Sequence, residues 1–210
     1  MREPAEAWDA PYPARIGLLI LAAGASTRLG QPKQLLPFRG RSLLRHAAET
    51  ALASVCRPVV VVLGAFADRL LTELRELPVT VALNPTWAEG MASSIRTGLR
   101  VASEPSEPDA VVIMLCDQPL VTATMLNQLV NVHRSKACGI VASEYEGTLG
   151  VPALFNRKYF PELGWLEGDQ GARKIIVKYK HDAARIPMPE AAFDVDRLEE
   201  AARLEEFGRL

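Results

Sequence analysis

Four short runs of apolar residues alternate with helix-length segments along the chain, and this alternation limits the fold more than any other feature. Each run is brief, apolar and soon followed by Gly, Asn or Asp, as expected of strands that are buried on both faces. The predicted strands are Ile16–Ala22, Pro58–Leu63, Pro78–Leu83 and Ala110–Cys116. The predicted helices are Ser42–Ser54, Ala65–Leu77, Ser93–Ala102 and Thr122–Arg134. This order predicts an α/β fold whose mostly parallel sheet carries helices on both faces.

The rest of the chain is less regular. Further strands are predicted at Gly139–Ser143, near Pro152–Phe155 and near Ala191–Val195, with helices at Gly171–Tyr179 and Arg197–Phe207. Met1–Arg15 holds three prolines and no periodicity, which predicts a flexible N-terminal extension. With 210 residues in the chain, we expect residues 16–210 to form a single domain, a size that buries roughly 70% of the surface of the unfolded chain.

Composition excludes several classes of protein. The net charge is −1, which argues against a protein that binds nucleic acid through a basic face. The longest apolar stretch, Ile16–Ala23, is far shorter than the roughly 20 residues of a membrane span, and no basic segment of signal-peptide type precedes it. Cys56, Cys116 and Cys138 are isolated and odd in number, so we expect no disulfide framework and a cytoplasmic location.

The loop after the first predicted strand is the first candidate site, because ligands of open parallel sheets lie beyond the carboxyl ends of the strands. It runs from Leu21 to Lys33, and its small residues allow close approach of the backbone to phosphate. Arg28 and Lys33 add positive charge. Ser26 replaces the second glycine of the dinucleotide fingerprint, and Gln31 replaces the lysine of a P-loop. A solvated glycine turn with two surface cations is the structural alternative.

Acidic residues follow later strands. Asp117 comes directly after the fourth predicted strand, where a carboxylate can hold Mg²⁺ that bridges phosphates. Asp194 and Asp196 alternate at the end of another predicted strand, so their side chains are expected to point to one side. For all three acids, a helix cap or a turn is the structural alternative.

Taken together, these motifs give the chain a resemblance to a known family. The stretch LAAGASTRLGQPKQLLPFRGRSLL resembles the signature of nucleotidyltransferases that activate a phosphorylated acceptor with an NTP, and within them the molybdenum cofactor cytidylyltransferases and molybdopterin-guanine-dinucleotide synthases. Other matching stretches follow in family order at Asn84–Ser94 with Gly98, Cys116–Pro119, Gly150–Pro152, Gly168–Arg173 and Asp194–Asp196. The resemblance covers about residues 16 to 200 and implies a three-layer α/β/α, Rossmann-like nucleotidyltransferase fold.

The resemblance also implies roles for individual residues. The catalytic residues would be Lys33, Arg28 and Asp117. The nucleotide would be held by Leu21, Ala22, Ala23, Gly24, Arg28, Lys33, Asn84, Gly90, Met91 and Ser94. The acceptor would contact Gln118, Pro152, Asp169, Gly171 and Arg173. Magnesium would be held by Asp117, Asp194 and Asp196, although Arg197-Leu198 replace the Thr-Pro usual after this last motif, which leaves open which of the two late acids touches the metal.

The implied reaction transfers CMP from CTP to the phosphate of molybdopterin and releases pyrophosphate. The sequence Ala22-Ala23-Gly24 resembles the cytidylyltransferase type, whereas guanylyltransferases tend to have two glycines at the loop centre. The nucleotide would bind in the half up to about residue 120 and the acceptor in the half after it. A monomer is expected, with transient contact to a molybdoenzyme or its chaperone and none to nucleic acid or membrane. The alternatives are a GTP-using guanylyltransferase, a sugar-phosphate or methylerythritol-phosphate nucleotidyltransferase, and a non-catalytic nucleotide-binding accessory protein.

Overall fold

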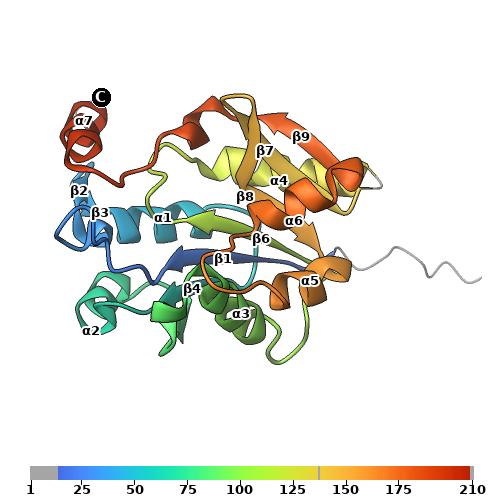
Figure 1. Cartoon of the computed structure of the whole chain (residues 1–210), viewed down its shortest axis with the longest axis horizontal. Helices are drawn as coiled ribbons and strands as arrows, with labels where there is room; N and C mark the ends of the chain where they lie inside the picture. The colour runs from blue at the N-terminus through green and yellow to red at the C-terminus, as the bar shows by residue number, and fades with distance from the viewer. Residues whose placement is uncertain (1–13, 137, 209–210) are drawn as a thin grey trace, which may run out of the picture.

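A computed structural model describes residues 14–136 and 138–208 of the chain. Its centre is a seven-stranded sheet with the order β5-β4-β1-β6-β8-β7-β9, and a two-stranded sheet, β2-β3, lies beside it (Figure 1). Six strands of the large sheet run in one direction, and β8 runs antiparallel to both of its neighbours. The predicted mostly parallel α/β sheet is therefore confirmed.

The strands are β1 Ile16–Ala22, β2 Pro37–Phe38, β3 Arg41–Ser42, β4 Val59–Leu63, β5 Thr80–Leu83, β6 Ala110–Leu115, β7 Ile140–Tyr145, β8 Thr148–Asn156 and β9 Ala183–Pro187. The α-helices are α1 Leu43–Leu52, α2 Ala67–Leu70, α3 Met91–Ala102, α4 Ala123–Ser135, α5 Phe160–Gly164, α6 Arg173–Lys178 and α7 Leu198–Gly208. Short 3₁₀ helices are η1 Lys33–Leu35, η2 Leu71–Leu74, η3 Trp87–Glu89, η4 Arg157–Tyr159, η5 Lys180–Asp182 and η6 Pro189–Ala192.

Successive residues of β1 point to opposite faces of the sheet and build two separate cores. Leu18 and Ile20 pack with α1 and α4, whereas Leu19 and Leu21 pack with α3, α5 and α6. Every residue of β1 is buried. The three-layer α/β/α arrangement follows from this double burial, and Figure 1 shows α3, α5 and α6 together on one side of the sheet.

A third, smaller core lies at one end of the sheet. Leu29, Leu36 and Phe38 pack there with Val195 and with Leu204 of α7. This core joins the segment after β1 to the segment that precedes α7, which are far apart in the sequence. The carboxyl ends of β1 and β6 point toward this end of the molecule, on the left of Figure 1.

Several elements differ from the prediction. The predicted helix Ala65–Leu77 is broken into α2 and η2, and Phe66, the residue before α2, has a left-handed φ of 61°. The strand predicted near Ala191–Val195 is wrong, because η6 ends at Ala192 and the following residues form a loop. The sheet edge is instead formed by β9, which pairs in parallel with β7 and was not predicted.

β7 and β8 form a hairpin that the sequence analysis placed as two shorter strands. Glu146 and Gly147 make its two-residue turn, with φ values of 49° and 71°. Two successive residues with positive φ match the tight turn that suits the twist of paired strands. The hairpin places β8 against β6, so both halves of the chain share one sheet.

The predicted extension Met1–Arg15 falls largely on residues 1–13, outside the described residues. Arg15 itself is held, because its backbone N–H donates to Asp109 Oδ2 at 2.9 Å. Cys56, Cys116 and Cys138 form no disulfide, as expected. Among the residues that the structure describes, no helix is long and apolar enough to span a bilayer.

Candidate active site

A pocket of about 370 Å³ opens where β1 and β6 end. One wall is the loop after β1, the opposite wall is the start of α3, and Asp117 stands at its base directly after β6. The lining residues are Leu21, Ala22, Ala23, Gly24, Ala25, Ser26, Thr27, Lys33, Gln34, Trp87, Ala88, Gly90, Met91, Ser94, Leu115, Cys116, Asp117 and Asp169. Most of the predicted nucleotide-binding residues therefore meet in one place.

The loop after β1 is held in shape by the side chain of Gln34, which is 1% exposed. Its amide Nε2 donates to the carbonyl oxygens of Ala22 at 3.0 Å and Gly24 at 2.8 Å. Ser26, with a φ of 53°, accepts a hydrogen bond from the Lys33 backbone N–H at 3.1 Å. Because two loop carbonyls are occupied by Gln34, the loop has a fixed shape before any ligand arrives.

Lys33 connects two acids across the mouth of the pocket. Its ammonium donates to Asp117 Oδ2 and, at 2.5 Å, to Asp196 Oδ1. Arg28 lies further out, with its Nη1 atom 3.6 Å from Asp196 Oδ2 and its side chain 75% exposed. The predicted catalytic trio of Lys33, Arg28 and Asp117 thus belongs to one charged cluster, which also contains Asp196.

The charges of this cluster shift one another's titration. Burial opposes the charge of Lys33, but attraction and hydrogen bonds to Asp117 and Asp196 prevail and raise the pKa of Lys33 above its usual value. The hydrogen bond from Lys33 lowers the pKa of Asp196. Loss of hydration and the nearby carboxylate of Asp117 raise the pKa of Asp194. Lys33 is therefore a cation, and Asp196 is ionised, at neutral pH.

Cys116 lines the pocket as a buried free thiol. Complete burial, together with the neighbouring charge of Asp117, raises the pKa of its thiol to about 12. A thiol in this state stays protonated at neutral pH, and it is the thiolate that reacts.

Asp117 has the features of a metal ligand. Its side chain is 7% exposed, and its Oδ1 atom is buried with no hydrogen-bond partner among the described residues. A hard divalent cation takes such carboxylate oxygens as ligands. In the part of the chain that the structure describes, however, no three or more acidic, His or Cys side chains are grouped to hold a metal by themselves. Ligands from a bound phosphate would therefore have to complete a metal site at Asp117.

The segment between β5 and α3 is organised around Asn84, which does not line the pocket. Its Nδ2 atom donates to Ser93 Oγ at 2.8 Å and Ser94 Oγ at 3.1 Å, and its Oδ1 accepts from Thr86. Asn84 is 2% exposed. It positions Ser94 at the pocket wall, so its place in the structure is that of a brace.

Gly90 is required for a close approach at the roof of the pocket. Its φ is 106°, and a Cβ atom there would collide with the backbone of Gly168. The backbone N–H of Ala92 donates to the Gly168 carbonyl at 3.1 Å. The segment that carries Asp169 thus rests on the start of α3.

A second cavity of about 200 Å³ adjoins the first and shares Leu21, Met91, Leu115 and Asp169 with it. Its other lining residues are Ile113, Tyr145, Gly150, Val151, Gly171, Ala172 and Arg173. Three of the five residues predicted to bind the acceptor, Asp169, Gly171 and Arg173, therefore lie together beside the first pocket. The Arg173 Nη2 atom donates to Thr148 Oγ1 at 2.5 Å.

The other two predicted acceptor residues lie behind this wall. Gln118 is 5% exposed and donates to the carbonyls of Val151 at 3.1 Å and Ala191 at 2.7 Å. Pro152 is buried in β8. Neither lines either cavity, although Gln118 bonds to the carbonyl of Val151, which lines the second cavity.

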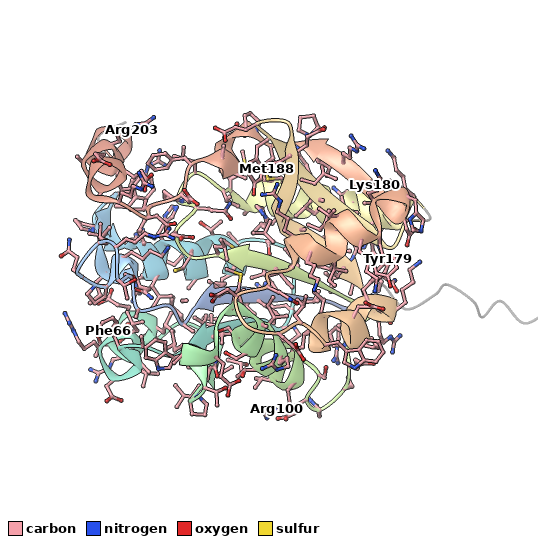
Figure 2. All side chains as sticks on the ribbon, viewed as in Figure 1. Phe66, Arg100, Tyr179, Lys180, Met188 and Arg203 are labelled. Atoms are coloured by element: carbon pink, nitrogen blue, oxygen red, sulfur yellow. The ribbon has the colours of Figure 1, made fainter. Side chains whose placement is uncertain are left out.

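The sequence analysis missed Gln34, Ser26 and Trp87. Gln34 follows Lys33 in the signature stretch, and its burial has no signal in composition, because a polar residue in a loop is normally exposed. Figure 2 shows how densely side chains from many elements fill the molecule, so that such a contact is visible only in three dimensions.

The chain is similar in sequence to known proteins. The sequence profile of the MobA-like NTP transferase domain matches residues 18–184. Nicotine blue oxidoreductase of Paenarthrobacter nicotinovorans is 33% identical, over 93% of this chain and 98% of that protein. Purine catabolism protein PucB of Bacillus subtilis is 31% identical, over 78% of this chain and 81% of its own.

Solved structures are similar to this one in fold. The crystal structure of Rv0371c from Mycobacterium tuberculosis superimposes with a TM-score of 0.81 at 30% identity, covering 93% of this chain and 99% of that one. A structure of the same protein in complex with manganese has a TM-score of 0.76 at 28% identity, covering 91% and 98%. The molybdenum cofactor cytidylyltransferase of Escherichia coli is more distant, at 21% identity over 86% of this chain and 91% of its own.

Proposed function

The chain belongs to the MobA-like NTP transferase family, and from this premise we propose that it transfers CMP from CTP to the phosphate of a molybdopterin-type acceptor, with release of pyrophosphate. As a member of this family it is a nucleotidyltransferase; the base and the acceptor are the proposal. One observation supports transfer from an NTP above all: Asp117, whose Oδ1 atom is buried without a partner among the described residues, lines the same pocket as the preshaped loop after β1 and Lys33.

The chain's own residues would act mainly by position and charge. The loop after β1, fixed by Gln34, would receive the triphosphate, and Lys33 and Arg28 would neutralise its oxygens. Asp117, with Asp194 or Asp196, would hold Mg²⁺, which supplies positive charge between the phosphates. The manganese complex of the Mycobacterium tuberculosis relative supports a divalent cation in this family.

No general base is needed for this reaction. A phosphate dianion is already a nucleophile at neutral pH, so the acceptor oxygen can attack the α-phosphorus in line while pyrophosphate leaves. The protein must bring two anions together and orient them. The adjoining cavity lined by Asp169, Gly171 and Arg173 supports binding of the acceptor there, next to the nucleotide pocket.

The preference for CTP rests on Ala22-Ala23-Gly24, which resembles the loop of cytidylyltransferases, and on the relative from Escherichia coli. Two more similar relatives are named for nicotine blue and for purine catabolism, so the acceptor is the part of the proposal that most needs a direct test. We place the enzyme in the cytoplasm, where NTPs are made, and expect a monomer that contacts a molybdoenzyme or its chaperone transiently.

The test is pyrophosphate release by the purified protein with Mg²⁺ and each of the four NTPs in turn. Each NTP is offered alone, with molybdopterin that carries inserted molybdate, with methylerythritol phosphate and with sugar 1-phosphates. We expect release with CTP and the molybdopterin acceptor only. Release with GTP would overturn the base preference, and release with another phosphate would overturn the acceptor. CTP binding without release on any acceptor would favour a nucleotide-binding accessory protein.

A further inference from the structure

The ammonium of Lys33 occupies the space between two carboxylates that come from distant parts of the chain. Asp117 follows β6, and Asp196 lies in the loop before α7. Lys33 donates to one oxygen of each, at 2.5 Å in the case of Asp196. The side chains of Lys33 and Asp117 are only 17% and 7% exposed. The protein without nucleotide therefore already holds a cation at this position.

Asp117 depends on that cation. Within the part of the chain that the structure describes, Lys33 is its one ion-pair partner within 4 Å. A buried carboxylate is strongly unfavourable without a compensating charge, and Lys33 supplies that charge in the nucleotide-free protein. Asp196 differs, because Arg28 gives it a second and more exposed positive neighbour at 3.6 Å.

The segment that carries Asp196 is firmly placed against the site. The backbone N–H of Val195 donates to the Asp117 carbonyl at 3.1 Å, and Val195 is fully buried. Glu200 accepts hydrogen bonds from the backbone N–H of Asp196 at 2.6 Å and of Arg197 at 2.7 Å. These bonds fix the backbone that carries Asp196 beside Asp117, whereas Lys33 reaches the two carboxylates on a flexible side chain.

This inference rests on the proposed function, which places a divalent cation at Asp117 and one of the later acids. In that proposal the divalent cation binds Asp117 Oδ1, whereas the ammonium of Lys33 contacts Oδ2 of the same carboxylate and Oδ1 of Asp196. Two cations on one carboxylate repel each other, so each opposes the binding of the other. A triphosphate on the loop after β1 offers Lys33 new anionic partners within the same pocket.

We propose that Lys33 fills the cation position between Asp117 and Asp196 in the nucleotide-free protein, so that the divalent metal binds together with the nucleotide and not before it. Lys33 moves to the triphosphate as the nucleotide binds, and its departure removes the positive charge that opposes the metal and frees Asp117 Oδ2 and Asp196 Oδ1. By reciprocity, nucleotide and metal raise each other's affinity. Lys33 thus contacts first the two carboxylates and then the triphosphate, and it prevents the nucleotide-free pocket from binding metal.

The test measures Mn²⁺ binding by electron paramagnetic resonance, with and without a CTP analogue that has a methylene bridge between its α- and β-phosphates. Without nucleotide, Lys33→Met is expected to bind Mn²⁺ roughly tenfold or more tightly than the wild type. The analogue should raise the affinity of the wild type strongly and that of Lys33→Met much less. Lys33→Gln, which retains an amide donor, provides a second variant in case Lys33→Met folds poorly, and it should behave in the same direction.

Two controls make the result specific. Lys180→Met removes a positive charge at η5, on the opposite side of the molecule (Figure 2), and should leave Mn²⁺ binding unchanged. In the double variant that combines Lys33→Met with Asp117→Asn, the gain in Mn²⁺ affinity should be lost. Unchanged or weaker Mn²⁺ binding by both Lys33 variants, while the analogue still raises the affinity of the wild type, would overturn the inference alone. No effect of the analogue on Mn²⁺ binding by the wild type would count against the proposed function itself.

Discussion

At the scale of single residues, the site depends on buried polar side chains whose polar atoms form hydrogen bonds or ion pairs. The amide of Gln34 donates to the loop after β1 and that of Asn84 to two serines of α3, and each side chain is 2% exposed or less. Lys33 and Asp117 compensate each other's charge. Breaking such a buried pair typically costs about 3–5 kcal/mol when one partner is left uncompensated. We attribute the presence of this charged pair in a pocket to a ligand that needs the same charges.

Asp117→Asn should remove activity and leave the fold intact. The amide keeps the volume of the side chain, and Lys33 keeps its contact with Asp196, but the negative charge that would hold the metal is lost. We expect kcat/KM to fall on the order of 10²-fold or more, by analogy with the loss of one preorganised charged group. Pyrophosphate release measures it. Asp68→Asn, an exposed acid in α2, is the matched control, and near-wild-type turnover by Asp117→Asn would remove Asp117 from the site.

Gln34→Met should loosen the loop after β1. The carbonyls of Ala22 and Gly24 then lose their donor, which costs about 1–3 kcal/mol if they stay buried or lets them turn into the pocket. We expect the Kd for CTP, measured by calorimetry, to rise about tenfold. Ser54→Ala also removes a buried side-chain hydrogen bond, at the end of α1 away from the pocket, and should lower stability without changing the Kd. Equal Kd values for Gln34→Met and the wild type would refute this role.

At the scale of elements, the strands with two buried faces were predictable and the edge strand β9 was not. β1, β4 and β6 are nearly continuous apolar runs, so their position in the centre follows from composition. β9 pairs only with β7 and includes Arg185 and Pro187, so nothing in its composition marks a strand. Phe193–Asp196 has strand-like alternation, yet Val195 packs into the small core beside α7 and makes no ladder. In the site, Lys33 and Asp117 were predicted because they lie in segments that follow predicted strands. The hydrogen bonds of Gln34 to the loop after β1 were not predicted, because they depend on tertiary contacts alone.

Asp182, directly before β9, forms contacts that help to hold this strand in place. Partial burial opposes ionisation of Asp182, but hydrogen bonds from Lys158, from Tyr159 at 2.5 Å and from the Gly139 N–H lower its pKa to about 2. Because this pKa is lower in the folded than in the unfolded chain, the contribution to stability is complete above about pH 4 and is lost as the pH falls toward 2.

Asp182→Asn is therefore expected to lower the free energy of unfolding by about 1–2 kcal/mol at pH 7. The difference from the wild type should shrink steadily below pH 4. Urea unfolding at a series of pH values measures it. A difference that stays constant from pH 7 to pH 3 would show that the charge of Asp182 is not what holds β9.

At the scale of the whole molecule, one sheet runs through both functional halves. β6 pairs with β1 on one side and with β8 on the other, from Ala110↔Asn156 to Ile113↔Ala153. The nucleotide pocket and the adjoining cavity lie on this shared sheet and have four residues in common. We therefore propose that residues 16–210 fold as a single domain, and that the division near residue 120 is one of function only.

A single unfolding transition is the expected consequence. Trp87 lies in the half proposed to bind the nucleotide and Trp165 in the half proposed to bind the acceptor. Each can therefore report on its own side once Trp8 and the other tryptophan are replaced by Phe. Urea midpoints followed by fluorescence should coincide for the two single-tryptophan variants after correction for their own stabilities by circular dichroism. Two separate midpoints would mean that the halves unfold independently.

The central claim is that the pocket at the carboxyl ends of β1 and β6 holds an NTP and a divalent cation at Asp117. It is tested most directly by a crystal structure of the protein with CTP and Mn²⁺, in which anomalous scattering locates the metal. We predict a manganese peak at coordination distance from Asp117 Oδ1, with the triphosphate on the loop after β1 and Lys33 turned toward it. A triphosphate bound elsewhere, or manganese away from Asp117 with Lys33 still between the two acids, would contradict this account.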